Sequence, residues 1–183
     1  MGETEYQEAL KLGKKEYKSC VYRGRFPYLP VLDDILSRED IRTEQNMGLI
    51  QIPLEFVVGT STMGRTFSFA SNFMPILGED TEFAIKWANL SDAQVNEGIR
   101  DPIIAYEYMN RYYVVEGNKR VSVLKYFKAD SIVANVTRKI PKYSDDEAVK
   151  VYYEYMKFNE VTGLFNIEFS KLGLAQELLE LTG

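Results

Sequence analysis

Residues 112–124 read Tyr-Tyr-Val-Val-Glu-Gly-Asn-Lys-Arg-Val-Ser-Val-Leu, and in this stretch a single glycine joins two kinds of pattern. The first four residues, aromatic and β-branched, are typical of a strand. After Gly117 the apolar residues Val121 and Leu124 recur at helical spacing. The stretch therefore predicts a strand that turns sharply into a helix at Gly117.

The predicted turn is a candidate anion site. The first N–H groups of a helix have no intrahelical acceptor and lie at the positive end of its dipole. Asn118, Lys119 and Arg120 would surround these groups, and Ser122, further along the predicted helix, is a further candidate binding residue. The alternative is a plain turn glycine followed by solvated cations.

Composition excludes several classes of site. The chain has 183 residues, enough for one domain with helical additions, and a net charge of −5. It contains no histidine and one cysteine, Cys20, so histidine-based triads, histidine or cysteine-cluster metal centres and an internal disulfide cannot form. No apolar stretch approaches transmembrane length and the N-terminus is polar, so we expect a cytoplasmic protein that does not enter membranes.

We expect an N-terminal helical arm at residues 1–48. Thr4 begins a capping-box pattern, and residues 37–48 read as a polar connection. The arm carries a cationic stripe and two arginines: Lys11, Lys14, Lys15, Lys18, Arg23 and Arg25. This pattern fits either a partner-binding arm or a solvated helix face. The acidic net charge disfavours a large DNA footprint but leaves room for a local basic patch.

Residues 49–141 are predicted to form the core. Its expected strands are 50–58, 103–108, 112–115 and 132–136, with a turn at Asn110-Arg111. Helices should begin at Asp80, with a restart at Ser91, and after Gly117. The loop after the first strand could expose N–H groups to phosphate. Its candidate binding residues are Gly59, Thr60, Ser61, Gly64 and Arg65. It lacks the Gly-Lys-Ser/Thr end of a P-loop, and a plain loop remains the alternative.

A C-terminal helical extension is predicted for residues 142–183. A capping-box pattern at Ser144 opens one helix, and a leucine-rich helix follows at the end of the chain. The last helix has little polar flank, which favours pairing with a second copy or with a further domain.

The order of these elements resembles the ParB/sulfiredoxin superfamily and, more closely, a bacterial ParB-like family of uncharacterised role, often named as nucleases or transcriptional regulators. The resemblance rests on Ile52-Pro53, Val58-Gly59-Thr60, Gly64-Arg65, Phe73, Pro75 and Val114 to Val123. It covers roughly residues 50–140, and residues 160–181 more loosely. It implies an α+β fold with a small mixed sheet, packed helices and helical extensions at both ends. It also implies an acid-Gly-x-x-Arg motif, here Glu116, Gly117 and Arg120, that holds nucleotide phosphates.

The chain departs from that family at informative positions. Glu116 replaces the common Asp, and Asn118-Lys119 replaces His-His. Sulfiredoxins need a cysteine in this motif, so Asn118 excludes sulfinic-acid reduction. The acidic tail supplies no basic helix-turn-helix of the ParB kind.

The resulting hypothesis is a phosphate- or nucleotide-binding module. Its ligand would be a nucleoside triphosphate or diphosphate with Mg²⁺, or another phosphorylated small molecule, held by Lys119, Arg120 and Arg65. Glu116 would accept a proton or hold Mg²⁺, which would permit hydrolysis or phosphoryl transfer. The alternatives are a non-catalytic regulatory or DNA-associated module and a purely structural unit of a longer polypeptide.

Overall fold

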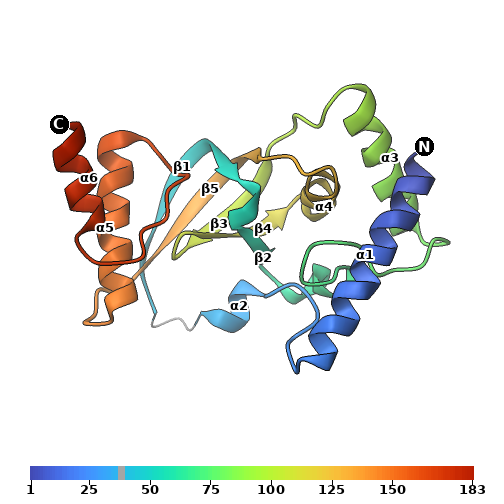
Figure 1. Ribbon diagram of the computed structural model, residues 1–183, viewed down its shortest axis with the longest axis horizontal. Helices are drawn as coiled ribbons and strands as arrows, with labels where there is room; N and C mark the ends of the chain where they lie inside the picture. The colour runs from blue at the N-terminus through green and yellow to red at the C-terminus, as the bar shows by residue number, and fades with distance from the viewer. Residues whose placement is uncertain (37–39) are drawn as a thin grey trace.

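A computed structural model describes residues 1–36 and 40–183 and has a five-stranded mixed sheet at its centre (Figure 1). The strands are β1 (Ile41–Pro53), β2 (Val57–Thr60), β3 (Ile103–Tyr108), β4 (Arg111–Glu116) and β5 (Ser131–Pro141). Their order across the sheet is β1-β5-β3-β4-β2. The pairs β1–β5 and β3–β4 are antiparallel, whereas β3–β5 and β2–β4 are parallel.

Helices lie at both ends of this sheet. They are α1 (Gly2–Tyr22), α2 (Leu32–Ile35), α3 (Glu82–Asn96), α4 (Asn118–Tyr126), α5 (Glu147–Thr162) and α6 (Leu174–Thr182), with short 3₁₀ segments η1 (Leu54–Phe56) and η2 (Met63–Ser68). Figure 1 shows α5 and α6 at one end of the sheet and α1, α3 and α4 at the other, so the two termini lie far apart. The α+β architecture with a mixed sheet and packed helices is as predicted.

Strand alternation explains the position of the main core. In β3, Ile103 and Ala105 are fully buried, and in β5 Ala134 and Val136 are buried while Asn135 between them is exposed. One face of the central strands therefore carries the apolar core, as period-two alternation requires.

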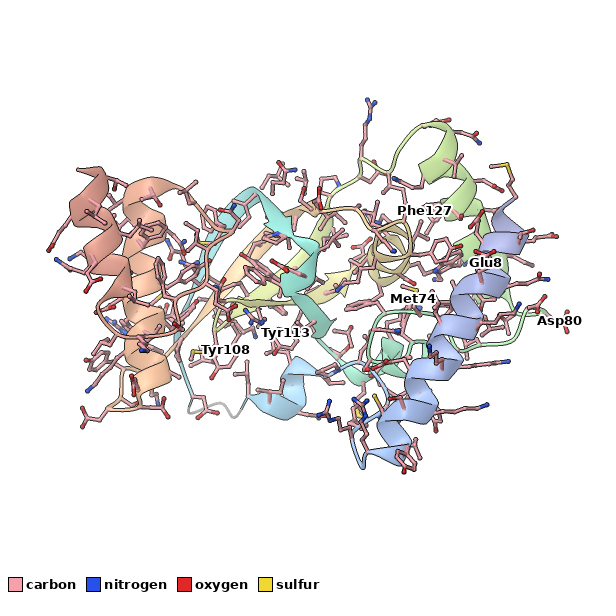
Figure 2. All side chains as sticks on the ribbon, viewed as in Figure 1. Glu8, Met74, Asp80, Tyr108, Tyr113 and Phe127 are labelled. Carbon is pink, nitrogen blue, oxygen red and sulfur yellow. The ribbon has the colours of Figure 1, made fainter. Side chains whose placement is uncertain are left out.

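A second apolar cluster joins α1, α3 and α4. Tyr6 and Leu10 of α1 pack with Trp87 of α3 and Val123 of α4, and Met74 lies beside α1 (Figure 2). The helix α1 comes so close that a Cβ at Gly13 would lie 2.1 Å from the Pro75 carbonyl oxygen. The apolar face of α1 is thus committed to the interior.

The prediction of a polar connection at residues 37–48 is wrong from residue 41 onward, because β1 begins at Ile41. Residues 37–39 of that prediction lie outside the described chain. This strand pairs antiparallel with β5 over its length, from Ile41 opposite Pro141 to Pro53 opposite Ser131. Its residues 42–46 are exposed, so backbone pairing at the sheet edge forms the strand rather than apolar burial. The strand crosses the predicted boundary at residue 48, and the division of the chain into domains stays a prediction.

The structure also corrects other element boundaries. The predicted strand 50–58 is interrupted by η1, which separates β1 from β2. The helix α3 is capped by Thr81 rather than Asp80, since the Thr81 hydroxyl accepts from the Ala84 N–H at 3.1 Å. Ser91 lies buried within α3, so no second helix starts there. Likewise α5 is capped by Asp146, whose carboxylate accepts from the Ala148 N–H at 2.8 Å.

A turn joins β3 and β4 as predicted, but one residue earlier than Asn110-Arg111, because Arg111 already belongs to β4 and pairs with Tyr108. Met109 and Asn110 both have positive φ, 51° and 60°, as two-residue hairpin turns require. The Glu107 carboxylate accepts the Asn110 N–H at 2.9 Å and helps to hold this turn.

The same carboxylate belongs to a buried ionic network between the sheet and α5. Arg138 Nε of β5 donates to Glu107 Oε2 at 2.7 Å, and both side chains are almost completely buried. The Tyr152 hydroxyl donates to Glu107 at 2.6 Å, and an Arg138 guanidinium N–H donates to Asn159 Oδ1 at 2.8 Å. Desolvation by burial and the Glu107 charge raise the pKa of Tyr152 well above its usual range. Both charges are therefore paired and hydrogen-bonded, and α5 supplies two of the partners.

We expect Arg138→Met to lower the free energy of unfolding by about 3–5 kcal/mol, because it leaves the Glu107 charge buried without its partner. The matched control is Lys150→Met, which removes an ion pair to the exposed Asp145 at 3.5 Å and should cost less than about 1 kcal/mol. Urea unfolding followed by circular dichroism measures both. Equal losses in the two variants would contradict a special role for the buried pair.

Candidate functional site

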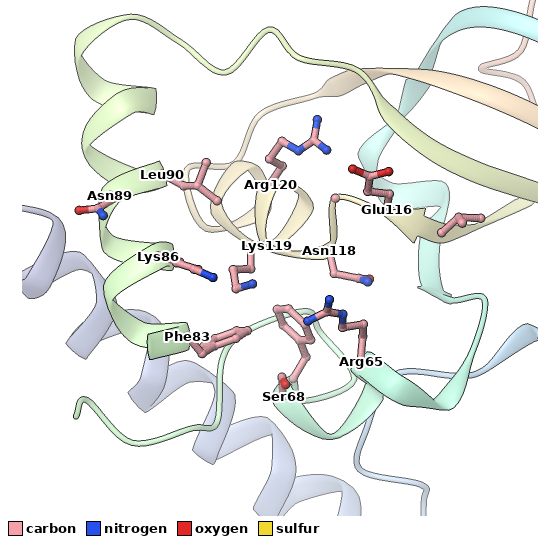
Figure 3. Close-up of a pocket in the computed structure, with 13 residues that line it drawn as sticks. Arg65, Ser68, Phe83, Lys86, Asn89, Leu90, Glu116, Asn118, Lys119 and Arg120 are labelled. Carbon is pink, nitrogen blue, oxygen red and sulfur yellow. The ribbon is translucent and has the colours of Figure 1, made fainter. Parts of the chain in front are cut away.

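A cleft of about 540 Å³ opens where β4 turns into α4 (Figure 3). One wall is the turn itself, from Val115 to Arg120; the others come from η2 and α3. The cleft therefore joins segments from three separate parts of the chain.

Gly117 makes the wall at the turn possible. Its φ of 111° lies in the left-handed region, which favours glycine. A Cβ there would lie 2.5 Å from Ile103 Cγ2, closer than any side chain can approach. The helix α4 can lie against β3 only because this position has no side chain.

The N-terminus of α4 faces the cleft without a cap. No side chain accepts from its first turn, and the first N–H with a backbone acceptor is that of Val121, bonded to the Gly117 carbonyl oxygen at 3.1 Å. For the described residues, the N–H groups of Asn118, Lys119 and Arg120 have no backbone acceptor. They form the positive end of the helix dipole.

Asn118 adds an unpaired acceptor at this point. The residue is only 7% exposed, and its Nδ2 donates to the Thr60 hydroxyl at 3.4 Å. Its Oδ1 is buried and has no hydrogen-bond partner within the described structure. In Figure 3 the Asn118 amide extends toward Arg65. An unpaired buried acceptor is costly, so a ligand that donates an O–H or N–H to it would stabilise the site.

Positive side chains converge on the cleft. Arg65, Lys86, Lys119 and Arg120 line it, whereas Glu116 is the one acidic side chain among the described lining residues. Burial lowers the pKa of the Lys119 ammonium, and repulsion from Arg65 and Lys86 lowers it further, although Glu82 opposes this. Lys86 pairs with Glu82 at 2.6 Å, but that carboxylate lies at an exposed position. The cleft thus has an excess of positive charge.

Arg120 has an additional structural task. Its Nη1 donates to the carbonyl oxygens of Asp101 at 3.1 Å and Pro102 at 2.7 Å, in the segment that leads into β3. Arg120 therefore fixes that segment against the turn at Gly117. Within the described chain no ion pair joins it to Glu116.

Glu116 lies exposed at the rim of the cleft (Figure 3). It makes no ion pair or side-chain hydrogen bond to any described residue. No group of three or more acidic or cysteine side chains that could hold a metal ion occurs in the described chain. A Mg²⁺ ion here would have one carboxylate and would need ligand phosphates and water for its other positions, as Mg²⁺ commonly does.

Most residues of the predicted phosphate loop lie elsewhere. Gly59 allows a close backbone approach, since a Cβ there would lie 2.3 Å from the Pro30 carbonyl oxygen. The N–H groups of Thr60 and Ser61 donate to the carbonyl oxygens of Pro30 and Val114, both at 2.9 Å, so they are not free for phosphate. Gly64 does not line the cleft. Only Arg65 of this loop does.

Ser122 is also placed away from the cleft. It is fully buried, and its hydroxyl oxygen accepts from Trp87 Nε1 at 2.8 Å in the core between α3 and α4. Helical geometry explains this, because Ser122 is four residues beyond Asn118 and belongs to the next turn, where α4 packs on α3. Its predicted role in binding does not agree with this position.

The contribution of α3 to the cleft was not predicted from the sequence. Phe83, Lys86 and Leu90 line the cleft from one face of that helix, and Lys119 Nζ lies 5.1 Å from the Phe83 ring centroid. The sequence does carry a signal for this face, because Phe83, Lys86 and Leu90 are spaced three and four residues apart and so lie on one side of a helix. A lysine within such an otherwise apolar stripe indicates a binding site. Asn89 and Ser68 border the cleft as well, and Figure 3 shows the Asn89 amide turned outward.

Comparison of the sequence with models of protein families and with curated proteins finds no match. Over residues 1–36 and 40–183, no helix has the length and apolar character needed to cross a membrane.

The close approach at Gly117 is open to a direct test. We expect Gly117→Ala to destabilise the protein by about 1–3 kcal/mol more than Gly173→Ala, measured by urea unfolding. Gly173 is the matched control, since it also precedes a helix with a positive φ of 92° but has nothing within 4 Å of an added Cβ. Similar losses would mean that the approach of Ile103 is unimportant.

Proposed function

We propose that the cleft binds a phosphate group of a nucleotide or of another phosphorylated small molecule. The observation that carries this proposal is the convergence of four cations, three of them without an ion-pair partner in the described chain, on an uncapped helix N-terminus. Positive charges gathered in one cleft repel one another, and a bound anion relieves that repulsion.

The parts of the cleft would divide the task. The free N–H groups of Asn118, Lys119 and Arg120 would hold phosphate oxygens at the positive end of α4. Lys119 would neutralise phosphate charge from the same wall, and Arg65 and Lys86 would contact the phosphate from the other two walls. Arg120 would mainly keep the turn in place, because two carbonyl oxygens already occupy one of its nitrogens.

The remaining lining favours a nucleotide over a bare phosphate ion. The half-buried Phe83 gives part of the cleft an aromatic surface, and the buried Phe69 packs edge-to-face behind it, with ring centroids 5.2 Å apart. The unpaired Asn118 Oδ1 suits a hydroxyl or amino donor, which a nucleoside carries and a fully ionised phosphate lacks. A cleft of about 540 Å³ also exceeds what one phosphate group requires.

Glu116 is the candidate for chemistry on a bound triphosphate. As an unpaired carboxylate at the rim, it is free to accept a proton from an attacking hydroxyl group or water molecule, or to hold a Mg²⁺ ion. A Mg²⁺ ion bound there would supply charge neutralisation to the phosphates.

We further propose that the core is of the ParB/sulfiredoxin type. The support is the strand-to-helix turn at Glu116-Gly117 in a mixed sheet, with an arginine three residues after the glycine. This assignment rests on likeness of pattern and does not itself establish activity.

A thermal-shift screen tests binding. We expect one or more of the four common nucleoside triphosphates or their diphosphates to raise the unfolding temperature, with and without Mg²⁺, and inorganic phosphate to have a smaller effect. A ligand at one hundred times its dissociation constant stabilises by about 2.7 kcal/mol. Arg65→Gln should weaken binding by about 1.5–3 kcal/mol, because it removes a charge-assisted hydrogen bond. Arg42→Gln is the control, since Arg42 is exposed on β1 and outside the cleft. If neither a nucleotide nor inorganic phosphate shifts the transition, the proposal is wrong.

A second experiment separates binding from chemistry. Glu116→Gln deletes a negative charge that repels phosphate, so metal-free nucleotide binding should stay intact or tighten, measured by titration calorimetry. Where the wild-type protein releases phosphate from a bound triphosphate, the variant should lose that release. Glu97→Gln, at the exposed end of α3, controls for a general change in charge. Undiminished phosphate release by Glu116→Gln would leave Glu116 with no catalytic part.

A further inference from the structure

A second positive surface lies on the solvent side of α1 and the segment after it. We name it the N-terminal patch and define it by its cations and rings: Lys11, Lys14, Lys15, Lys18, Arg23 and Arg25, with Tyr17, Tyr22, Phe26, Tyr28 and Phe67. Apart from Phe67, which η2 supplies, all of these residues come from the first 28 of the chain.

The cations of the patch are not neutralised. In the part of the chain that the structure describes, none of the six forms an ion pair. Three of the four acidic residues of α1 have hydrogen-bond partners outside the patch. The Glu5 and Glu8 carboxylates both lie 2.6 Å from the Tyr126 hydroxyl, whose single proton they share, and Glu16 accepts from the Ser71 hydroxyl at 3.0 Å. Figure 2 shows Glu8 on α1 close to the end of α4. An acidic protein thus presents a local surface of positive charge.

Aromatic rings are interleaved with these cations. Tyr28 packs edge-to-face against Tyr17, Phe26 and Phe67, with ring centroids 5.5, 5.6 and 4.8 Å apart. Phe26 and Phe67 remain 55% and 51% exposed, and Tyr22 is 93% exposed. A cluster of exposed aromatic rings that pack against one another is typical of a binding surface.

Cations and rings also share one hollow. Its volume is about 210 Å³, and Lys14, Lys18, Tyr17, Tyr28 and Ile76 line it. A ligand seated there meets positive charge and an aromatic ring at once.

We propose that the N-terminal patch binds single-stranded nucleic acid. The phosphates of a single strand would follow the cations, and its unstacked bases would stack on the exposed rings, the combination that such proteins use. Duplex DNA keeps its bases stacked inside and would use the cations alone. The binding surface is separate from the cleft, although η2 carries Phe67 to one and Arg65 to the other.

An anionic membrane is the competing partner for a basic helix with aromatic residues. Membrane binding of such a helix requires an apolar face that can enter the lipid. The apolar face of α1 is occupied, because Tyr6 and Leu10 are buried and Gly13 lies against the backbone of Met74 and Pro75. The structure therefore favours nucleic acid.

Fluorescence anisotropy with the full chain tests the proposal. The probes are labelled twelve-nucleotide oligo-dT and oligo-rU and a twelve-base-pair duplex. Both single strands should bind more tightly than the duplex. If four cations contact phosphates, the logarithm of the association constant should fall against the logarithm of salt concentration with a slope of about −3. Binding should then weaken about fifty-fold between roughly 50 and 200 mM salt.

Variants separate the contribution of rings from that of charge. Phe67→Ala should weaken single-strand binding at least about five-fold, and Phe67→Tyr, which keeps a ring, should restore it. Lys14→Gln with Lys18→Gln should reduce the salt slope by about 1.4. The matched charge control is Lys157→Gln with Lys171→Gln, exposed residues at the other end of the molecule, which should change neither slope nor affinity (Figure 1). Circular dichroism verifies the fold of each variant.

Any one of several outcomes would overturn the proposal. They are no binding by the wild type, duplex binding as tight as single-strand binding, equal losses in the patch and control lysine variants, and tight binding to vesicles of anionic phospholipid without binding to oligonucleotides. Loss of oligonucleotide binding in Lys86→Gln, with none in the patch variants, would place the strand in the cleft and also overturn it. Nucleotide binding in the cleft is measured separately, so each proposal can fail alone.

Discussion

The backbone at Gly117 has to pass from strand to helix within one residue, directly against the side chain of Ile103. Both the left-handed φ of 111° and the 2.5 Å approach to Ile103 exclude a side chain at this position. Because the turn is this tight, α4 lies across the core face of the sheet and packs against α3, which in turn holds α1. The cleft is a direct result, since the same turn leaves the first N–H groups of α4 without a backbone acceptor at the cleft wall.

A different constraint holds the opposite end of the sheet. Glu107 and Arg138 form an ion pair, and each also has a hydrogen-bond partner on α5. Neither buried charge is therefore left unpaired. A buried ion pair contributes little net stability compared with apolar residues of the same shape, but removing one partner is costly. We infer that the pair mainly fixes the position of α5. Tyr152 and Asn159 can hydrogen-bond to Glu107 and Arg138 in one arrangement only, and that arrangement sets where α5 lies against the strands.

Charge is distributed locally in this acidic chain. The net charge is −5, yet the cleft and the N-terminal patch each gather cations that the surrounding acidic residues do not balance. At physiological salt, interactions between exposed charges fade beyond about 8 Å, so the local arrangement governs binding more than the net charge does. The segment η2 contributes to both surfaces, with Arg65 and Ser68 in the cleft and Phe67 in the N-terminal patch. If both proposals hold, a ligand in the cleft and a strand on the patch would share this segment.

Features that depend on short-range chemistry could be read from the sequence alone. These include the strand–glycine–helix turn at Gly117, a hairpin turn within one residue of its observed place, the helix near Glu147 and, from the absence of histidine, the classes of site that cannot exist. Each follows from side-chain periodicity or from the φ that one residue can adopt, which neighbours in sequence determine.

Features that depend on distant partners required the tertiary structure. The polar residues 41–48 became strand because β5 pairs with them, and Lys86 joined the site because α3 packs beside α4. Conversely, Thr60 and Ser61 lost their free N–H groups to backbone carbonyls, and Ser122 turned to Trp87. Sequence thus determined which residues could bend, cap and carry charge. Only the packed chain decided which hydrogen-bonding groups remained unpaired, because that depends on partners tens of residues away.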